Sequence, residues 1–169
     1  MYGCCQAVFS FEADAALMKQ LIIAGLFAGI ATTASAAETP TCLGEGPVRL
    51  TVDVTGVRSP DGEMAVTVYP DDPSRFLAPG GKLARARVEA HAPVTQACFN
   101  LPGPGAYAVA VYHDANANHD FDRTIVGMPT EGFGFSNNPV VQNALPDYGA
   151  VRTVVPRAGK AITVRLRYP

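Results

Sequence analysis

The sequence predicts an all-β fold, a single antiparallel β-sandwich of about seven or eight strands with a long irregular loop at one end. Apolar and polar residues alternate in short runs, which is the pattern of strands with one buried face. Turn signals separate these runs at spacings typical of β-sandwiches, and no convincing helix follows residue 38. A small barrel is the alternative architecture.

The N-terminal part of the chain has the pattern of an export signal. In residues 18–37, Lys19 supplies a positive charge, an apolar stretch follows, and Ala34-Ser35-Ala36 is a small-x-small cleavage site. The apolar stretch is short for a membrane span, so an uncleaved anchor is the weaker alternative. We interpret residues 1–17 as an extension from a misassigned start codon. The expected product is a periplasmic or secreted domain of residues 38–169, without a stable membrane anchor.

Composition restricts the classes of partner. The chain has 13 Lys and Arg against 15 Asp and Glu, a formal net charge of −2, and no basic patch. Nucleic acid is therefore a poor candidate partner. Two cysteines lie in the domain, Cys42 and Cys98. A cysteine pair in an exported protein is most simply a disulfide, whereas a metal pair or free thiols would lack neighbouring ligands.

The first half of the domain is predicted to hold four strands. Alternating residues on both sides of a Ser-Pro-Asp-Gly turn at 59–62 indicate a hairpin over residues 48–69. Residues 70–82 form a loop rich in Pro and Gly. Residues 83–89 and 94–100 are two further strands, which a short turn joins.

The second half begins with a tight turn at residues 101–105. Small residues on both sides of the run 106–113 indicate a central strand that is covered on both faces. The last strands are expected at residues 151–155 and 161–168. Alternating arginines in two of the strands predict solvated faces and protected edges. These are Arg85, Arg87, Arg165 and Arg167.

Residues 113–139 form the long loop, HDANANHDFDRTIVGMPTEGFGFSNNP. Long irregular segments in a compact domain are usually functional. Its first half carries oxygen-bearing side chains at every second position: Asp114, Asn116, Asn118, Asp120 and Asp122. Such a string can coil around one Ca²⁺, with Glu131 from the Gly-rich second half as an outer ligand. The Gly and Glu of a helix-loop-helix calcium loop are absent, so an Asx-rich turn without metal is the alternative.

Residues 101–138 resemble the signature of a family of exported bacterial proteins, the domain of unknown function 2141. The motifs are a Leu-Pro turn before a Gly-x-Tyr strand, then His-Asp-x-Asn-x-Asn-x-x-x-Asp, then Gly-x-Pro-x-Glu-Gly-x-Gly-Phe-Ser-Asn. The matching residues of the loop are His113, Asp114, Asn116, Asn118, Asp122, Gly127, Pro129, Glu131, Gly132, Gly134, Phe135, Ser136 and Asn137. Residues 101–107 also resemble prealbumin-like modules. The resemblance implies an exported prealbumin- or immunoglobulin-like sandwich without an established activity.

The chain departs from the family pattern within the Asn-x-Asn loop. Family members usually carry Gly there, whereas this chain has Ala117 and His119. If these positions need a positive φ, His119 tolerates it better than Ala117.

The leading functional hypothesis is a non-catalytic binding or structural module of the cell envelope. Its loop would present a shaped surface to an envelope partner or a small ligand, because a rigid scaffold with a shaped loop is sufficient for binding. The residues expected to form this surface are His113, Phe133, Phe135, Ser136 and Asn137. The two Phe rings are expected to pack as plugs, with an exposed aromatic surface as the alternative.

The alternative function is a metal-assisted hydrolase that uses His113, Asp114 and Glu131. No nucleophile is recognisable, because Ser136 lacks the second Gly of a Gly-x-Ser-x-Gly elbow. A buried, hydrogen-bonded role for His113 is the simpler interpretation.

Overall fold

The computed structural model describes residues 41–141 and 145–169. The predictions for residues 1–17 and for the signal peptide at 18–37 fall on residues outside this part. Within the described residues, no helix has the length and apolar character that crossing a membrane requires.

Strands dominate the described part of the chain, which confirms the all-β prediction. The strands are β1 (Val48–Thr55), β2 (Glu63–Tyr69), β3 (Ala84–Glu89), β4 (Val94–Leu101), β5 (Gly105–Asp114), β6 (Phe133–Phe135), β7 (Thr153–Val155) and β8 (Lys160–Arg165). One short helix, α1 (Tyr148–Val151), precedes β7. The last two strands are shorter than predicted, and β6 lies inside the segment that was predicted to be irregular.

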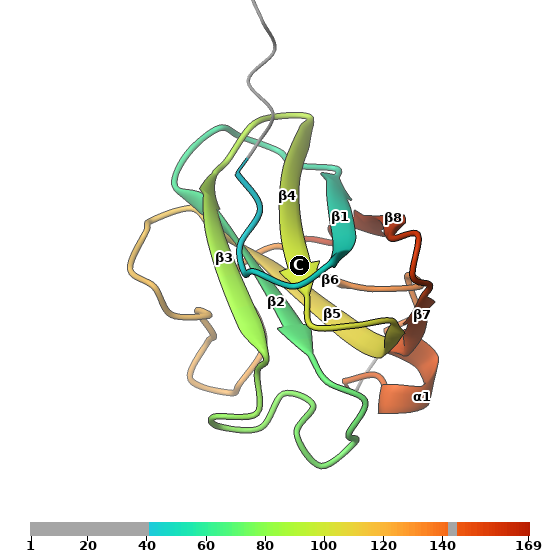
Figure 1. The fold of residues 1–169 in the computed structure, drawn as a ribbon. Helices are drawn as coiled ribbons and strands as arrows, with labels where there is room; N and C mark the ends of the chain where they lie inside the picture. The colour runs from blue at the N-terminus through green and yellow to red at the C-terminus, as the bar shows by residue number, and fades with distance from the viewer. Residues whose placement is uncertain (1–40, 142–144) are drawn as a thin grey trace, which may run out of the picture. The chain divides into compact units, whose positions relative to one another are not determined.

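The strands form two sheets (Figure 1). In the first, β1 lies between β4 and β8, antiparallel to β4 and parallel to β8. The second has the order β3-β2-β5-β6, in which all neighbours are antiparallel, and β7 also pairs with β5. The fold is therefore mostly antiparallel, and the β1–β8 pair departs from the purely antiparallel prediction.

The predicted hairpin over residues 48–69 is wrong, because β1 and β2 lie in different sheets. The chain crosses between the sheets at residues 56–62, and it crosses again between β3 and β4. The two crossings meet where the backbone N–H of Val57 donates to the carbonyl of Pro93 at 3.3 Å. Alternation shows that a strand has one buried face, but it does not identify the neighbouring strand.

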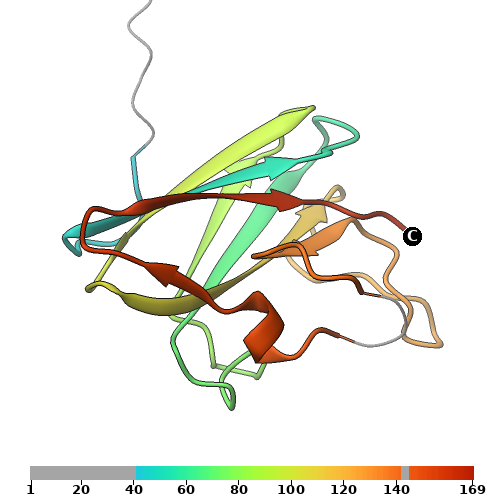
Figure 2. The ribbon, with the colours of Figure 1, turned by 90° about the vertical axis from the view of Figure 1, so that its right-hand side faces the viewer.

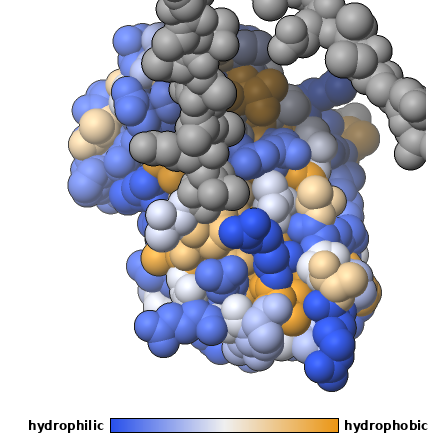
Figure 3. Space-filling model, turned by 45° about the horizontal axis from the view of Figure 1, so that its top comes forward, coloured by the Kyte–Doolittle hydropathy of each residue, from blue (hydrophilic) through white to orange (hydrophobic). Residues whose placement is uncertain are grey.

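Side chains of both sheets pack into one hydrophobic cluster. It contains the inward residues of β1 and β2, Val48, Leu50, Val52, Val54, Met64, Val66 and Val68, together with residues of β4, β5 and β8. On the face of the molecule in Figure 3, hydrophobic residues lie in small groups among hydrophilic ones.

The second cluster lies on the other face of the five-stranded sheet. Ala108 of β5 packs there with Tyr69, Phe135, Tyr148 and Val151, whereas Tyr107, Val109 and Val111 belong to the first cluster. β5 is thus a central strand covered on both faces, as predicted. Figure 2 shows α1 and the 70–82 loop on this side of the sheet.

An anchor of three side chains holds α1 to the 70–82 loop. Arg152 donates from Nε and Nη2 to the two carboxylate oxygens of Asp71, both at 2.8 Å, and the hydroxyl of Tyr148 donates to Asp71 at 2.8 Å. The bonds from Arg152 and Tyr148 lower the pKa of Asp71 to about 2. Burial and the bond to Asp71 raise the pKa of Tyr148 to about 12.

The start of the described chain runs beside β4. Cys42 and Cys98 form a disulfide, as predicted. Next to it, the N–H of Leu43 donates to the carbonyl of Cys98 at 3.0 Å, and the N–H of Asn100 donates to the carbonyl of Leu43 at 2.8 Å.

Candidate functional site

The front half of the loop is wound around the carboxylate of Asp114. This residue ends β5, and its side chain is 0% exposed. Its Oδ1 accepts the N–H of Asn118 at 3.0 Å, and its Oδ2 accepts the N–H of His119 at 2.9 Å and Nη1 of Arg87 at 2.9 Å. The buried charge therefore fixes the loop backbone to the sheet.

Arg87 of β3 connects this loop to three further groups. It donates to Glu63 at 2.6 Å, to the hydroxyl of Tyr112 at 2.9 Å and to the carbonyl of His119 at 2.7 Å. Burial lowers the pKa of Arg87, but the hydrogen bonds to Glu63 and Tyr112 outweigh it and hold the pKa above its ordinary value. Arg87 is thus a half-buried structural residue, and the prediction that it lies on a solvated face is wrong.

The side-chain oxygens of Asn116, Asn118 and Asp122, three further members of the predicted calcium set, bond to groups of the loop itself, and Asp120 is exposed. Oδ1 of Asn116 accepts the N–H of Asn118 at 3.1 Å, and Oδ1 of Asn118 accepts the N–H of Asp120 at 2.8 Å. The carboxylate of Asp122 accepts the side-chain amides of Asn116 and Asn118 at 2.8 to 3.1 Å. Among the described residues, no three His, Cys, Asp or Glu are grouped to hold a metal ion. The geometry is that of successive Asx turns, and calcium binding stays a prediction.

Ala117 and His119, which replace the Gly of the family pattern, both have a left-handed conformation. Their φ angles are 52° and 71°. A left-handed L-residue costs roughly 1–2 kcal/mol relative to the right-handed conformation. The N–H of His119 donates to the buried Asp114, so the hydrogen bonds around Asp114 stabilise a strained backbone.

Glu131 connects the Gly-rich second half of the loop to the first half. Its side chain is buried, and Oε2 accepts the N–H of Asp122 at 3.1 Å. Burial is the main cause that raises the pKa of Glu131, and the bond from Asp122 opposes it. The nearby carboxylates of Asp114 and Asp122 raise the pKa further.

His113 is buried, and both of its ring nitrogens contact protein groups. Nε2 lies 2.8 Å from the carbonyl of Asp61, and Nδ1 lies 2.8 Å from the hydroxyl of Tyr168. A carbonyl can only accept, so Nε2 carries the proton in the neutral ring and Nδ1 accepts from Tyr168. This arrangement positions the C-terminal segment against β5.

Ser136 and Asn137, like His113, bond through their side chains to other groups of the protein. Oγ of Ser136 accepts the N–H of Val109 at 2.9 Å and donates to the carbonyl of Val151. The side-chain amide of Asn137 donates to the carbonyls of Ala150 and Arg152 at 3.2 and 2.9 Å. These two side chains thus connect the segment after β6 to β5, to α1 and to Arg152 after α1.

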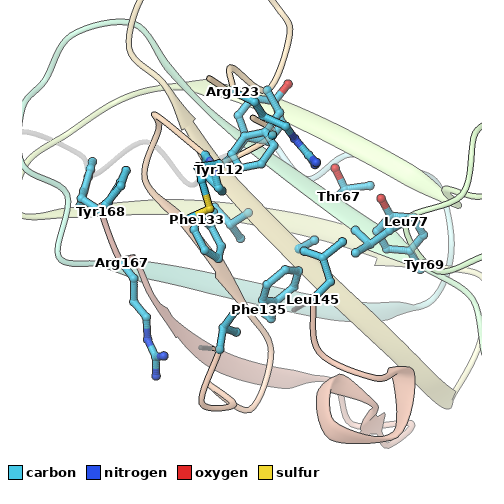
Figure 4. A pocket seen from close by; sticks show the side chains of 18 of the residues that line it. Thr67, Tyr69, Leu77, Tyr112, Arg123, Phe133, Phe135, Leu145, Arg167 and Tyr168 are labelled. Atoms are coloured by element: carbon cyan, nitrogen blue, oxygen red, sulfur yellow. The ribbon is translucent and has the colours of Figure 1, made fainter. Parts of the chain in front are cut away.

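Phe133 and Phe135, the other two residues of the predicted binding surface, line a pocket of about 840 Å³. This volume lies in the range of small-molecule sites, roughly 300–1,000 Å³. Six aromatic side chains line it: Tyr69, Tyr112, Phe121, Phe133, Phe135 and Tyr168. Figure 4 shows Tyr112, Phe133 and Phe135 along the pocket, with Arg123 on one side and Arg167 on the other.

The rings form a continuous series. Centroids lie 5.4 Å apart for Tyr112 and Phe121, 6.0 Å for Phe121 and Phe133, and 6.0 Å for Phe133 and Phe135. Phe76 continues the series beyond Phe135 at 6.2 Å. These edge-to-face and tilted contacts hold each ring in place, so the aromatic floor is preformed.

A small hairpin of the loop supplies one wall of this pocket. Arg123 bridges to Pro129, and the N–H of Thr124 donates to the carbonyl of Met128 at 2.8 Å. The hairpin brings Arg123 and Met128 to the pocket, while Ile125 at its tip is fully exposed.

In the part of the chain that the structure describes, three arginines and no Asp or Glu line the pocket. Arg85 of β3 donates from Nε to Oγ1 of Thr67 at 2.7 Å, and its guanidinium carbon lies 5.8 Å from the ring centroid of Tyr112. The guanidinium carbon of Arg123 lies 5.1 Å from the ring centroid of Phe121. Burial raises the pKa of the Tyr69 hydroxyl in the same wall, and the charge of Arg85 opposes this.

Comparison with known proteins gives one match. Residues 52–163 match a family described as "Uncharacterized protein conserved in bacteria (DUF2141)". The chain belongs to this family. No match was found among curated proteins or among solved structures.

The DUF2141 match confirms the resemblance that the loop motifs indicated, and it covers the loop and most of the pocket wall. Arg167, Tyr168 and Pro169 of the wall follow the matched residues. Sequence reasoning missed the pocket as a site. Tyr112 and Arg85 are visible in the sequence only as strand positions, and no local signal indicates that the loop and the C-terminal segment meet them.

Proposed function

We propose that this DUF2141 protein is a non-catalytic binding module of the cell envelope, and that it holds a small ligand in the aromatic pocket. The pocket itself is the observation that carries the proposal. It has the volume of a small-molecule site, a preformed aromatic floor and a few polar groups at its rim. The Arg87–Asp114 pair fixes the loop that forms one wall, so the pocket needs little ordering upon binding.

The proposed scaffold is a prealbumin- or immunoglobulin-like antiparallel sandwich of seven or eight strands. Two observations support it: both sheets contribute to one hydrophobic cluster, and eight strands occur in the described residues. In this proposal the loop and the pocket lie on the outer face of the larger sheet.

Export to the periplasm or the medium is part of the proposal. The predicted signal peptide at 18–37 and the Cys42–Cys98 disulfide support it. Intact mass of the exported protein should give an N-terminus near Ala37 or Glu38. Alkylation should label neither cysteine before reduction, and labelling of both would contradict an oxidising destination.

Ligand binding at the pocket is tested with a variant that fills it. Ala110 lines the pocket between Thr67 and Phe135 in the sheet register, so Ala110→Phe should block the floor. We expect at least one compound in a chemically mixed library to raise the melting midpoint of the wild type and not of Ala110→Phe. A ligand at a hundredfold excess over its Kd raises the free energy of unfolding by about 2.7 kcal/mol.

Ala161→Phe is the matched control, because Ala161 lies exposed on β8 outside the pocket wall. It should retain the ligand response. Equal responses of the wild type and Ala110→Phe to every compound, or no response to any, would refute pocket binding.

The alternative, a metal-assisted hydrolase, has less support. His113, Asp114 and Glu131 each bond to protein groups, and none of them lines the pocket. Turnover of an ester, phosphate or glycoside that disappears in His113→Ala, with the fold intact, would favour the hydrolase.

We also keep Ca²⁺ as a candidate ligand of the loop Asp114–Asp122, with Glu131 as an outer ligand. The side chains of Asn116, Asn118 and Asp122 already converge within hydrogen-bonding distance, and rotation of the two amides would direct oxygens inward. Calcium would then stabilise one wall of the pocket.

A further inference from the structure

We infer that the ligand of this pocket is an organic anion with an apolar body, an aryl or alkyl carboxylate or sulfonate whose charged group is held by Arg85 and Arg123. This inference rests on the proposed function and specifies the chemical class of the ligand.

The charge of the pocket differs in sign from that of the whole chain. The chain carries a formal net charge of −2, whereas the side chains that the described residues contribute to the pocket wall include Arg85, Arg123 and Arg167 and no Asp or Glu. None of the three arginines takes part in an ion pair within the described residues. Positive charge that the protein leaves uncompensated beside an apolar floor attracts and selects an anion.

Arg85 and Arg87 lie on one strand but differ in whether a carboxylate neutralises their charge. Both lie on the same face of β3, where residues two apart point in one direction. Arg87 is neutralised by Glu63 and Asp114 at 2.6 and 2.9 Å. Arg85 contacts the uncharged Thr67 and the ring of Tyr112. The same strand thus carries one structural arginine and one that forms no ion pair with any described residue.

Arg85 and Arg123 lie beside two neighbouring rings of the pocket. The ring centroids of Tyr112 and Phe121 lie 5.4 Å apart. The guanidinium carbon of Arg85 lies 5.8 Å from the centroid of Tyr112, and that of Arg123 lies 5.1 Å from the centroid of Phe121, both within cation–π range. The bond to Thr67 restricts the rotamers of Arg85, and the cation–π contact with Phe121 favours the observed position of Arg123. A guanidinium held in this way can bind a carboxylate or sulfonate with paired N–H donors.

The rest of the pocket suits the body of the ligand. The aromatic floor continues from Phe121 to Phe133 and Phe135, and Leu77, Val141 and Leu145 add aliphatic wall. A small inorganic anion would leave this surface in water, whereas an aryl or alkyl body covers it and gains the hydrophobic free energy of burial. The floor therefore selects an amphiphile over phosphate.

The test is calorimetric titration of the purified protein with matched probes. 2-Naphthoate and dodecanoate are the anionic aryl and alkyl probes, 2-naphthamide and dodecanol are their neutral counterparts, and inorganic phosphate is the anion without a body. We expect at least one of the two carboxylates to bind at least about tenfold more tightly than its neutral counterpart, because hydrogen bonds to charged groups contribute this much or more. The aryl and alkyl probes also distinguish the two kinds of body.

Substitutions of single arginines test which residues bind the carboxylate group of the probe. Arg85→Gln and Arg123→Gln should each weaken carboxylate binding about tenfold or more and should leave binding of the neutral probe unchanged. Arg49→Gln makes the same charge change at an exposed position of β1 that does not line the pocket, and it should bind like the wild type. Circular dichroism confirms the fold of each variant, and the two single substitutions serve as independent tests of the same contact.

Several results would overturn the inference. They are equal binding of neutral and anionic probes, equal binding of phosphate and carboxylates, and equal weakening by Arg49→Gln. If only neutral or cationic compounds bind, and Ala110→Phe abolishes that binding, the anion inference fails while the proposed binding function stands. If no compound binds, both fail.

Discussion

The ion pair between Arg87 and Asp114 gives a stability prediction that follows directly from burial. Arg87→Leu leaves the Asp114 carboxylate, which is 0% exposed, without its cationic partner. Breaking a buried ion pair from one side costs about 3–5 kcal/mol. Two backbone N–H groups still bond to Asp114, so we expect a loss near the lower value, about 3 kcal/mol. For a domain of this size the melting midpoint should fall by roughly 10 °C.

Urea unfolding of the wild type, Arg87→Leu, Asp114→Asn and the double variant measures this loss and the coupling between the two residues. The double variant should be more stable than the sum of the single losses predicts, because no unpaired buried charge remains. Arg152→Leu is the control, since its pair with Asp71 is 43% and 45% exposed and should contribute less. A loss in Arg87→Leu no larger than in Arg152→Leu, or additive single losses, would refute the reasoning.

Three further predictions concern the loop. Ala117→Gly should raise the free energy of unfolding in urea by about 0.5–1 kcal/mol, because Gly adopts the left-handed φ of 52° without strain. Ala115→Gly is the control, since φ is not positive there, and it should lower the free energy of unfolding. A more stable Ala115→Gly than Ala117→Gly would contradict this prediction. Burial raises the pKa of Glu131 above its ordinary 4.5, so the wild type loses stability as pH rises through the folded pKa. Glu131→Gln should therefore be more stable than the wild type at neutral pH and equal to it at pH below both pKa values, and unfolding at both pH values checks this. Millimolar Ca²⁺ should raise the melting midpoint relative to chelator if the loop Asp114–Asp122 binds it; identical midpoints would leave the Asx turns as the full description.

The sequence predicted where strands occur better than how they pair. Val48, Leu50, Val52 and Val54 alternate with polar residues, and they form the inward face of β1 as expected. The neighbours of β1 are β4 and β8, which are distant in the chain, because the segment after β1 crosses to the other sheet. Pairing depends on which apolar faces fit together in three dimensions, and alternation does not contain that information.

The loop was located from its composition, but its contacts were not predictable from it. The oxygen-bearing residues from Asp114 to Asp122 are compatible with either a cation or Asx turns. The decisive partner of Asp114 is Arg87, 27 residues earlier in the chain, and only the fold brings it there. β6 was missed because it spans only three residues, with Gly132 before it and Gly134 within it, and its pairing with residues 110–112 is a tertiary contact.

The segment from Leu43 to Gly46 occupies part of the outer hydrogen-bonding edge of β4, with N–H to carbonyl bonds at Cys98 and Asn100. An open strand edge is a template on which another chain can add a strand, and proteins cover such edges to avoid aggregation. The Cys42–Cys98 disulfide holds the covering segment in place. Reduction of the disulfide should therefore expose this edge of β4 and make the protein self-associate before it unfolds. In a reducing compartment we expect the chain to aggregate.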